Sequence, residues 1–204
     1  MPSGLASRVM NPLSPPVLLE ALAALPRDPI TPPADSHRIQ AAVALVLREP
    51  DPVDLLLIKR SQNPQDPWSG HMALPGGRLE AADAHLLETA MRETVEETGV
   101  VLLERSRFLG RLPTLMPTSR RLPPISVSPH IFLAGTSAEA VAASHEVESV
   151  HWVPLEDLRR GVGLDEVEIS FPDGSRRVFP CYRVEGEIVW GMTYRILQDF
   201  LALL

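Results

Sequence analysis

Three glutamates within five residues are the side chains of this sequence best suited to chemistry. Glu93, Glu96 and Glu97 are spaced i, i+3 and i+4, so a helix would place them on one face, within an arc of roughly 60 to 100°. Like charges at these spacings destabilise an isolated helix. A divalent cation that prefers oxygen ligands, such as Mg²⁺, would compensate for the repulsion. We therefore expect a metal site on this helix.

The residues that flank the three glutamates support this expectation. Gly76 and Gly77 form a turn before the helix, where a backbone without Cβ atoms can approach a ligand closely. Gly99 is placed to end the helix as its C-cap, and Arg92 can hold a carboxylate through a bidentate pair. The alternative is a solvated glutamate-rich surface without a ligand. The shared register of the flanking residues argues against that alternative.

The run from Gly77 to Val100 resembles the Nudix box, the loop-helix-loop motif of the Nudix hydrolases. The family pattern is Gly, five residues, Glu, seven residues, and then Arg-Glu-apolar-any-Glu-Glu-any-Gly-apolar. The second half matches at every fixed position except Thr94, where an aliphatic residue is usual. The first half is one residue longer, and Asp83 takes the place of the upstream Glu. Asp83 is expected either to cap a helix at 84–98 or to contact the metal.

The resemblance implies hydrolysis of a nucleoside diphosphate linked to another group, with Mg²⁺ or Mn²⁺ as cofactor. It also implies that Glu93, Glu96 and Glu97 are the metal ligands, together with a backbone carbonyl near Gly76. Arg92, Asp83, Gly77 and Gly99 would then have structural roles. For the general base, the alternatives are a box glutamate or a carboxylate on a separate loop. Our candidate for the separate carboxylate is Glu146, whose alternative role is an exposed charge, and Glu148 and Glu80 are weaker candidates.

Further segments are similar to the coenzyme A pyrophosphatase branch of the family, which releases 3′,5′-ADP and a phosphopantetheine. They include the longer box and the segments 59–61, 114–118, 127–129 and 190–193. The branch motif before the box is altered, because Trp68 replaces a His, His71 a Gln and Leu74 a Phe. The alternatives are ADP-ribose, another nucleoside diphosphate derivative, or an NTP. A non-catalytic nucleotide sensor is the alternative of a different class.

Three side chains are candidates for contact with a small-molecule nucleotide. Arg60 follows an apolar strand, and its guanidinium suits phosphate oxygens. Arg120, next to Arg121, offers the same chemistry, with an exposed surface position as the alternative. Trp68 has the flat ring needed to stack on adenine, although it could instead cover the edge of the core.

Composition limits the other classes of function. The chain has 204 residues and a net charge of −7, so a broad nucleic-acid interface is not expected. Cys181 is the single cysteine, which excludes an intrachain disulfide and fits a reducing compartment. No apolar stretch has the length of a membrane span, and the N-terminus lacks the features of a signal peptide. We expect a cytoplasmic protein without membrane partners.

The pattern along the chain predicts a proline-rich arm at 1–37 with a short helix at 17–25, followed by one hydrolase domain at 38–204. Within the domain, the box occupies 77–100, and a hairpin and helix occupy 161–204. The apolar stripe of the last helix, 190–204, indicates core packing, with a homodimer seam as the alternative.

Strands are predicted at 38–48, 53–59, 71–74, 108–112, 125–134, 146–153, 167–170 and 177–182. They do not alternate strictly with helices, which favours an α+β fold. The resemblance implies an α/β/α sandwich around a mixed β-sheet.

Overall fold

The computed structural model of the chain describes residues 13–32, 37–49, 52–63, 69–102, 106–117, 124–171 and 174–204. Their helices are α1 (Pro15–Ala21), α2 (Leu86–Thr98), α3 (Leu155–Arg159) and α4 (Gly191–Leu201). The strands are β1 (Ile39–Arg48), β2 (Asp54–Arg60), β3 (Met72–Ala73), β4 (Gly76–Arg78), β5 (Ser106–Arg111), β6 (Ile125–Ala134), β7 (Val147–Pro154), β8 (Leu164–Ser170), β9 (Arg176–Val184) and β10 (Glu187–Trp190).

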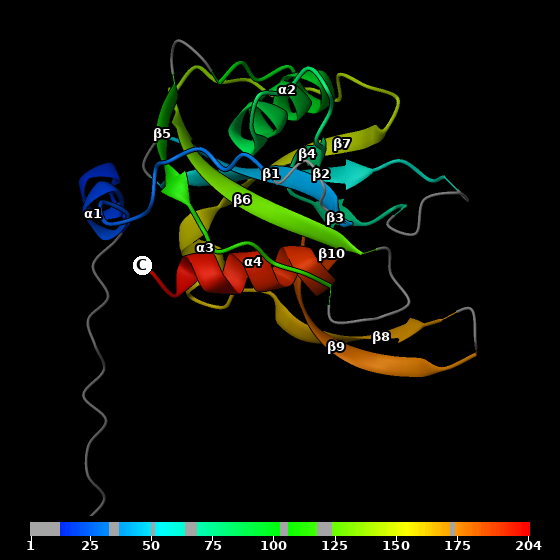
Figure 1. Cartoon of the computed structure of the whole chain (residues 1–204). Coiled ribbons are helices and arrows are strands. Elements are labelled where there is room, and N and C mark those ends of the chain that lie inside the picture. The colour runs from blue at the N-terminus through cyan, green and yellow to red at the C-terminus, as the bar shows by residue number, and fades with distance from the viewer. Residues whose placement is uncertain are drawn as a thin grey trace, which may run out of the picture.

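The main sheet is mixed, as the sequence predicted. Its order is β3-β2-β1-β6-β5, with β4 added to β1 and β7 added to β2 (Figure 1). Strands β1 and β6 run parallel along their whole length, and the other pairs are antiparallel. Strand β1 is therefore internal, which explains why it is almost continuously apolar.

The two faces of the sheet are covered by different helices, which confirms the α/β/α sandwich (Figure 1). On one face, Ala42 and Val46 of β1 share a core with Leu86 and Ala90 of α2. On the other face, Leu45 and Leu47 belong to the core that α4 completes with its buried side chains Ile196, Leu197 and Phe200. The alternation along β1 follows from the two-residue period of a strand. The apolar stripe of α4 thus packs in the core of its own chain.

The described part of the N-terminal arm packs on the same chain. Leu13, Leu18 and Leu22 are buried in the same core as the apolar side chains of α4. Farther along, the Arg111 N–H donates to the Pro26 carbonyl, and the Leu86 N–H donates to the Ile30 carbonyl. The segment after α1 therefore fixes the entry to α2 as well as the edge at β5.

Two strands were not predicted. Strand β4 contains two glycines in three residues, a composition that disfavours strands, and it forms because it pairs with Ala41, Ala42 and Val43 of β1. Strand β10 precedes α4, so the last helix begins at Gly191. A smaller sheet, β10-β9-β8, extends the predicted hairpin by one strand. Within the described ranges, no helix is both long and apolar enough to pass through a bilayer.

Candidate metal-dependent hydrolase site

Helix α2 carries the three glutamates and has well-formed ends. Its N-cap is His85, whose Nδ1 accepts from the Glu88 N–H at 3.3 Å, and not Asp83. At its other end, Gly99 has a left-handed conformation with φ 71°, and its N–H donates to the Val95 carbonyl. Thr94 departs from the box pattern, yet it is fully buried, and its hydroxyl donates to the Ala90 carbonyl at 2.7 Å. The buried hydroxyl of Thr94 is therefore hydrogen-bonded, so the helix accommodates threonine at this position.

The glycine turn lies directly against two of the glutamates. The Gly76 N–H donates to Glu97 Oε2 at 2.8 Å. A Cβ at Gly76 would overlap the Ala42 carbonyl, and a Cβ at Gly77 would overlap the Glu93 carboxylate. Gly76 therefore requires glycine because its φ is 154° and the backbone of β1 lies against it, whereas a side chain at Gly77 would displace the Glu93 carboxylate. Gly76 contacts the Glu97 carboxylate through its N–H, and a metal contact through its carbonyl stays a prediction.

Arg92 links the box loop to the glutamates. Its Nε and Nη2 donate to the two oxygens of Asp83 at 3.1 and 3.0 Å, which is a bidentate pair. Its Nη1 donates to Glu93 at 3.0 Å and to Glu96 at 3.2 Å, and its Nη2 also reaches the Arg78 carbonyl at 3.0 Å. The guanidinium holds the pKa of the Asp83 carboxyl below its usual range. Asp83 thus holds Arg92 in place. The sequence had suggested a helix cap or a metal contact for Asp83, and not this role.

The three glutamates differ in how deeply their side chains are buried. Glu97 is only 3% exposed, and burial raises the pKa of its carboxyl to about 8, with the charges of Glu93 and Glu146 adding to the shift. Burial also raises the pKa of Glu93, although Arg92 opposes the shift. The side chain of Glu96 is 56% exposed. Two carboxylates are therefore held where their negative charges are unfavourable without a cation.

The donor set fits a hard divalent cation. Glu93 and Glu97 repel each other, and Glu93 and Glu96 share one donor nitrogen of Arg92, so Glu93 lies near both of the other carboxylates. Among the described residues, no group of three Asp, Glu, His or Cys side chains is arranged so that it could hold a metal ion. Arg92 instead occupies oxygens of two glutamates. The side chains of Glu93, Glu96 and Glu97 offer only carboxylate oxygens, which are the ligands that Mg²⁺ and Mn²⁺ prefer.

Two further charged residues border the carboxylates. Arg60, at the end of β2, places its Nη1 3.8 Å from Glu97 Oε1. Glu146 is exposed just before β7, and its carbonyl accepts from the Ser61 N–H at 2.8 Å. The loop before it is tied to α2, because the Ala143 N–H donates to the Glu97 carbonyl at 3.0 Å. The structure therefore brings Arg60 and Glu146 to the predicted site.

Trp68 and Arg120, with its neighbour Arg121, lie outside the residues that the structure describes. Sequence reasoning missed the Gly76 N–H contact with Glu97, because a glycine turn does not indicate which backbone group faces a ligand. It also missed His85 as the N-cap, since Ser, Thr, Asp and Asn are the usual signals for that position.

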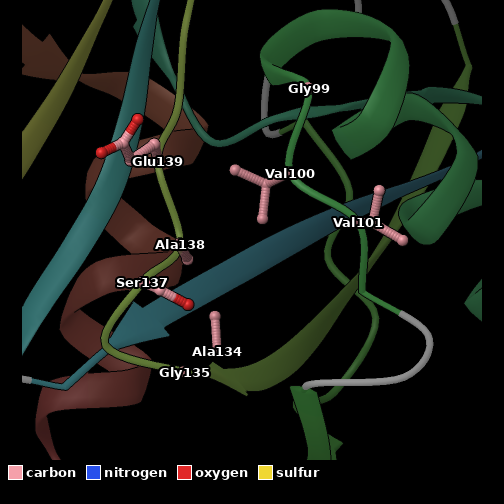
Figure 2. A pocket seen from close by; sticks show the side chains of 8 residues that line it. All are labelled: Gly99, Val100, Val101, Ala134, Gly135, Ser137, Ala138 and Glu139. Atoms are coloured by element: carbon pink, nitrogen blue, oxygen red, sulfur yellow. The ribbon is translucent and has the colours of Figure 1, made fainter.

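A cavity of about 300 Å³ lies just beyond the C-terminal end of α2. Figure 2 shows Val100 and Val101 on one side and the segment from Ala134 to Glu139 on the other. None of the three glutamates, nor Arg60 or Glu146, lines this cavity. The carboxylate site and the cavity are therefore separate features of the surface.

Comparison with known proteins agrees with this geometry. The NUDIX domain family matches residues 37–171. An uncharacterized Nudix hydrolase NudL of Citrobacter koseri is 31% identical over 164 residues, which cover 80% of this chain and 81% of the relative. An uncharacterized protein of Schizosaccharomyces pombe is 31% identical over 171 residues, which cover 75% of this chain and 52% of the relative. The chain thus spans about half the length of the yeast relative.

A solved structure shows the same fold. The MutT/nudix family protein of Enterococcus faecalis superposes with a TM-score of 0.51 and 20% identity, over 85% of this chain and 65% of that chain. The match to the family covers more than half of the sequence and includes the whole helix with its glycine turn. Family membership and the NudL relatives support a hydrolase that acts on pyrophosphate bonds. The chain belongs to the NUDIX domain family.

Proposed function

We propose that this protein is an Mg²⁺- or Mn²⁺-dependent pyrophosphohydrolase that cleaves the diphosphate of coenzyme A or an acyl-coenzyme A. The products are 3′,5′-ADP and the corresponding phosphopantetheine. The observation that carries the hydrolase assignment is the buried Glu97 carboxylate, held by the Gly76 N–H beside Glu93 and Arg60. Such a buried anion is costly for a protein unless a cation or a proton neutralises it.

Each residue of the site has a distinct role in the proposed reaction. Glu93, Glu96 and Glu97 would hold the ion, and the Gly76 N–H orients Glu97. When bound, the ion neutralises the diphosphate oxygens and makes water a stronger nucleophile at neutral pH. Arg60, whose Nη1 lies 3.8 Å from Glu97, would bind a phosphate oxygen of the substrate.

Glu146 is the proposed general base. Its charge raises the pKa of both Glu93 and Glu97, and its carbonyl accepts from the N–H of Ser61, the residue next to Arg60. From that position it would accept the proton of the attacking water. Arg92 and Asp83 are proposed as positioning residues that do not contact the substrate. Arg92 orients Glu93 and Glu96 through hydrogen bonds, and Asp83 holds Arg92 in place.

The choice of coenzyme A rests on the resemblance of several segments to one branch of the family, and Trp68, His71 and Leu74 depart from that branch. ADP-ribose, another nucleoside diphosphate derivative or an NTP is the second candidate substrate. The retention of all three box glutamates favours an enzyme over a nucleotide sensor. The acidic net charge and the single buried cysteine support a small-molecule substrate and a cytoplasmic location.

A substrate panel tests the proposal. Coenzyme A, acyl-coenzyme A, ADP-ribose, NADH, diadenosine polyphosphates and NTPs are incubated with Mg²⁺ or Mn²⁺, and the products are identified by chromatography. We expect coenzyme A derivatives to give the highest kcat/KM, and 3′,5′-ADP to be among their products. Preference for ADP-ribose would overturn the choice of substrate. Tight nucleotide binding without turnover of any compound would instead identify a sensor.

A further inference from the structure

Four half-buried rings form a continuous row beside the proposed active site. In order they are His71, Trp190, Phe179 and Phe171. The distances between successive ring centroids are 5.1, 5.2 and 6.1 Å. Neither hydrophobic core of the described residues includes these rings. Filling of the main cores therefore does not explain why they are aromatic.

Arg60 connects the row to the carboxylates. The Arg60 N–H donates to the His71 carbonyl at 3.0 Å, and the Arg60 guanidinium lies 3.8 Å from Glu97. The ring of Trp190 then meets His71 where β10 contacts β3. A substrate with its diphosphate beside Arg60 would therefore have the first ring of the row within reach of its next few atoms.

The row continues along one face of the β8–β9 hairpin. Phe179 lies opposite Val167 in the strand register, and Trp190 lies opposite Cys181. Val167 and Phe179 are half-buried, whereas Val178, on the other face, is 58% exposed. In Figure 1 the hairpin projects from the sandwich beyond α4. One face of this projecting hairpin thus carries an apolar strip that leads back to the site.

The tilt of the rings indicates what the strip would bind. Successive rings are inclined by 69°, 51° and 61°, so they do not form a parallel-sided slot. A planar base stacks best on a ring that lies parallel to it, in an offset arrangement. A flexible chain of methylene and amide groups can instead follow a corrugated apolar surface and bury its apolar area there.

We propose that the row His71–Trp190–Phe179–Phe171 binds the flexible, weakly polar arm of the substrate beyond the scissile diphosphate, of the acyl-pantetheine class. The inference rests on diphosphate hydrolysis at the carboxylate site and adds a selectivity for long acyl chains. Arg177, whose guanidinium carbon lies 5.5 Å above the Phe171 ring, marks the far end of the row.

The test compares kcat/KM for S-octanoyl- and S-acetyl-coenzyme A in three proteins. Wild type should prefer the octanoyl substrate by about tenfold, because its longer chain buries more apolar area. Phe179→Ser should reduce that preference to about twofold or less. Val178→Ser changes the adjacent residue on the opposite face and should keep the wild-type ratio. Circular dichroism checks that each variant folds, and Val167→Glu, on the strip beside Phe179, replaces Phe179→Ser if the latter does not fold.

The binding of S-octanoyl phosphopantetheine, measured by calorimetry on the metal-free proteins, separates this inference from the proposed function. We expect Phe179→Ser to weaken binding about tenfold and Val178→Ser to leave it unchanged. If no diphosphate is hydrolysed while these binding differences hold, the ring row stands and the proposed function fails. Equal octanoyl-to-acetyl ratios in wild type and Phe179→Ser would overturn the ring row alone. If Phe179→Ser lost the same fraction of its kcat/KM with ADP-ribose as with S-octanoyl-coenzyme A, the ring row would also be overturned. Such a result would indicate base stacking or a purely structural role for Phe179.

Discussion

Replacement of Glu97 by Gln should make the metal-free protein more stable while it abolishes the proposed activity. Glu97 is buried, and its pKa is raised from 4.5 to about 8. Each pKa unit corresponds to about 1.4 kcal/mol, so the raised pKa of Glu97 lowers the free energy of unfolding by about 5 kcal/mol above pH 8 and by about 3 kcal/mol at pH 7, relative to a carboxyl with an unshifted pKa. Gln retains an oxygen that can accept from the Gly76 N–H, but its buried amide has its own desolvation cost. We therefore expect a net gain of about 2 kcal/mol at pH 8.5.

The sign of the pH dependence is specific to a raised carboxyl pKa. The folded state keeps the proton of Glu97 between pH 4.5 and 8, whereas the unfolded state releases it. This contribution to stability is fully present below pH 4.5 and is lost as the pH rises through 8. The advantage of Glu97→Gln should therefore be small at pH 5.5 and largest at pH 8.5.

Urea denaturation of both proteins in EDTA, at pH 5.5, 7 and 8.5, measures this difference. Added Mg²⁺ should stabilise wild type by mass action and should stabilise Glu97→Gln much less. Glu96→Gln is the matched control, because its side chain is largely exposed and its removal should leave metal-free stability unchanged. Equal or lower stability of Glu97→Gln at pH 8.5, or a difference that does not vary with pH, would refute the reasoning.

Three other perturbations test separate parts of the structure. Gly77→Ala should lower kcat about 100-fold, because its Cβ displaces the Glu93 carboxylate, and unchanged turnover with Mg²⁺ would contradict that. Asp83→Ala should reduce the free energy of unfolding by about 3 kcal/mol, since it leaves partly buried Arg92 without its bidentate partner; chemical denaturation measures the change, and Asp199→Ala, at an exposed position of α4, serves as the comparison. Burial lowers the pKa of His130 to about 4 from 6.5, so its contribution to stability is present above pH 6.5 and is lost as the pH falls to 4. Between pH 7 and 4, wild type should therefore lose about 3 kcal/mol more stability than His130→Leu, and parallel pH profiles would argue against this role.

The sequence predicted the elements that have strong local signals. The long apolar runs identified β1 and β6, and the helical spacing of the box identified α2 to within two residues at its start. Strands β4 and β10 were missed because they are short, and pairing with a neighbouring strand is what makes them strands. The exact N-cap was missed because His85 is not a typical capping residue.

For the site, residue types and spacing were sufficient to propose the metal ligands and the family. Charge spacing along one helix is a local property, so the sequence alone indicates that Glu93, Glu96 and Glu97 share a face. Only the tertiary structure decided which carboxylate is buried, that Asp83 anchors Arg92, and that Arg60 and Glu146 reach the same site. These features depend on how segments distant in the sequence pack together, and that packing sets desolvation and the distances between charges.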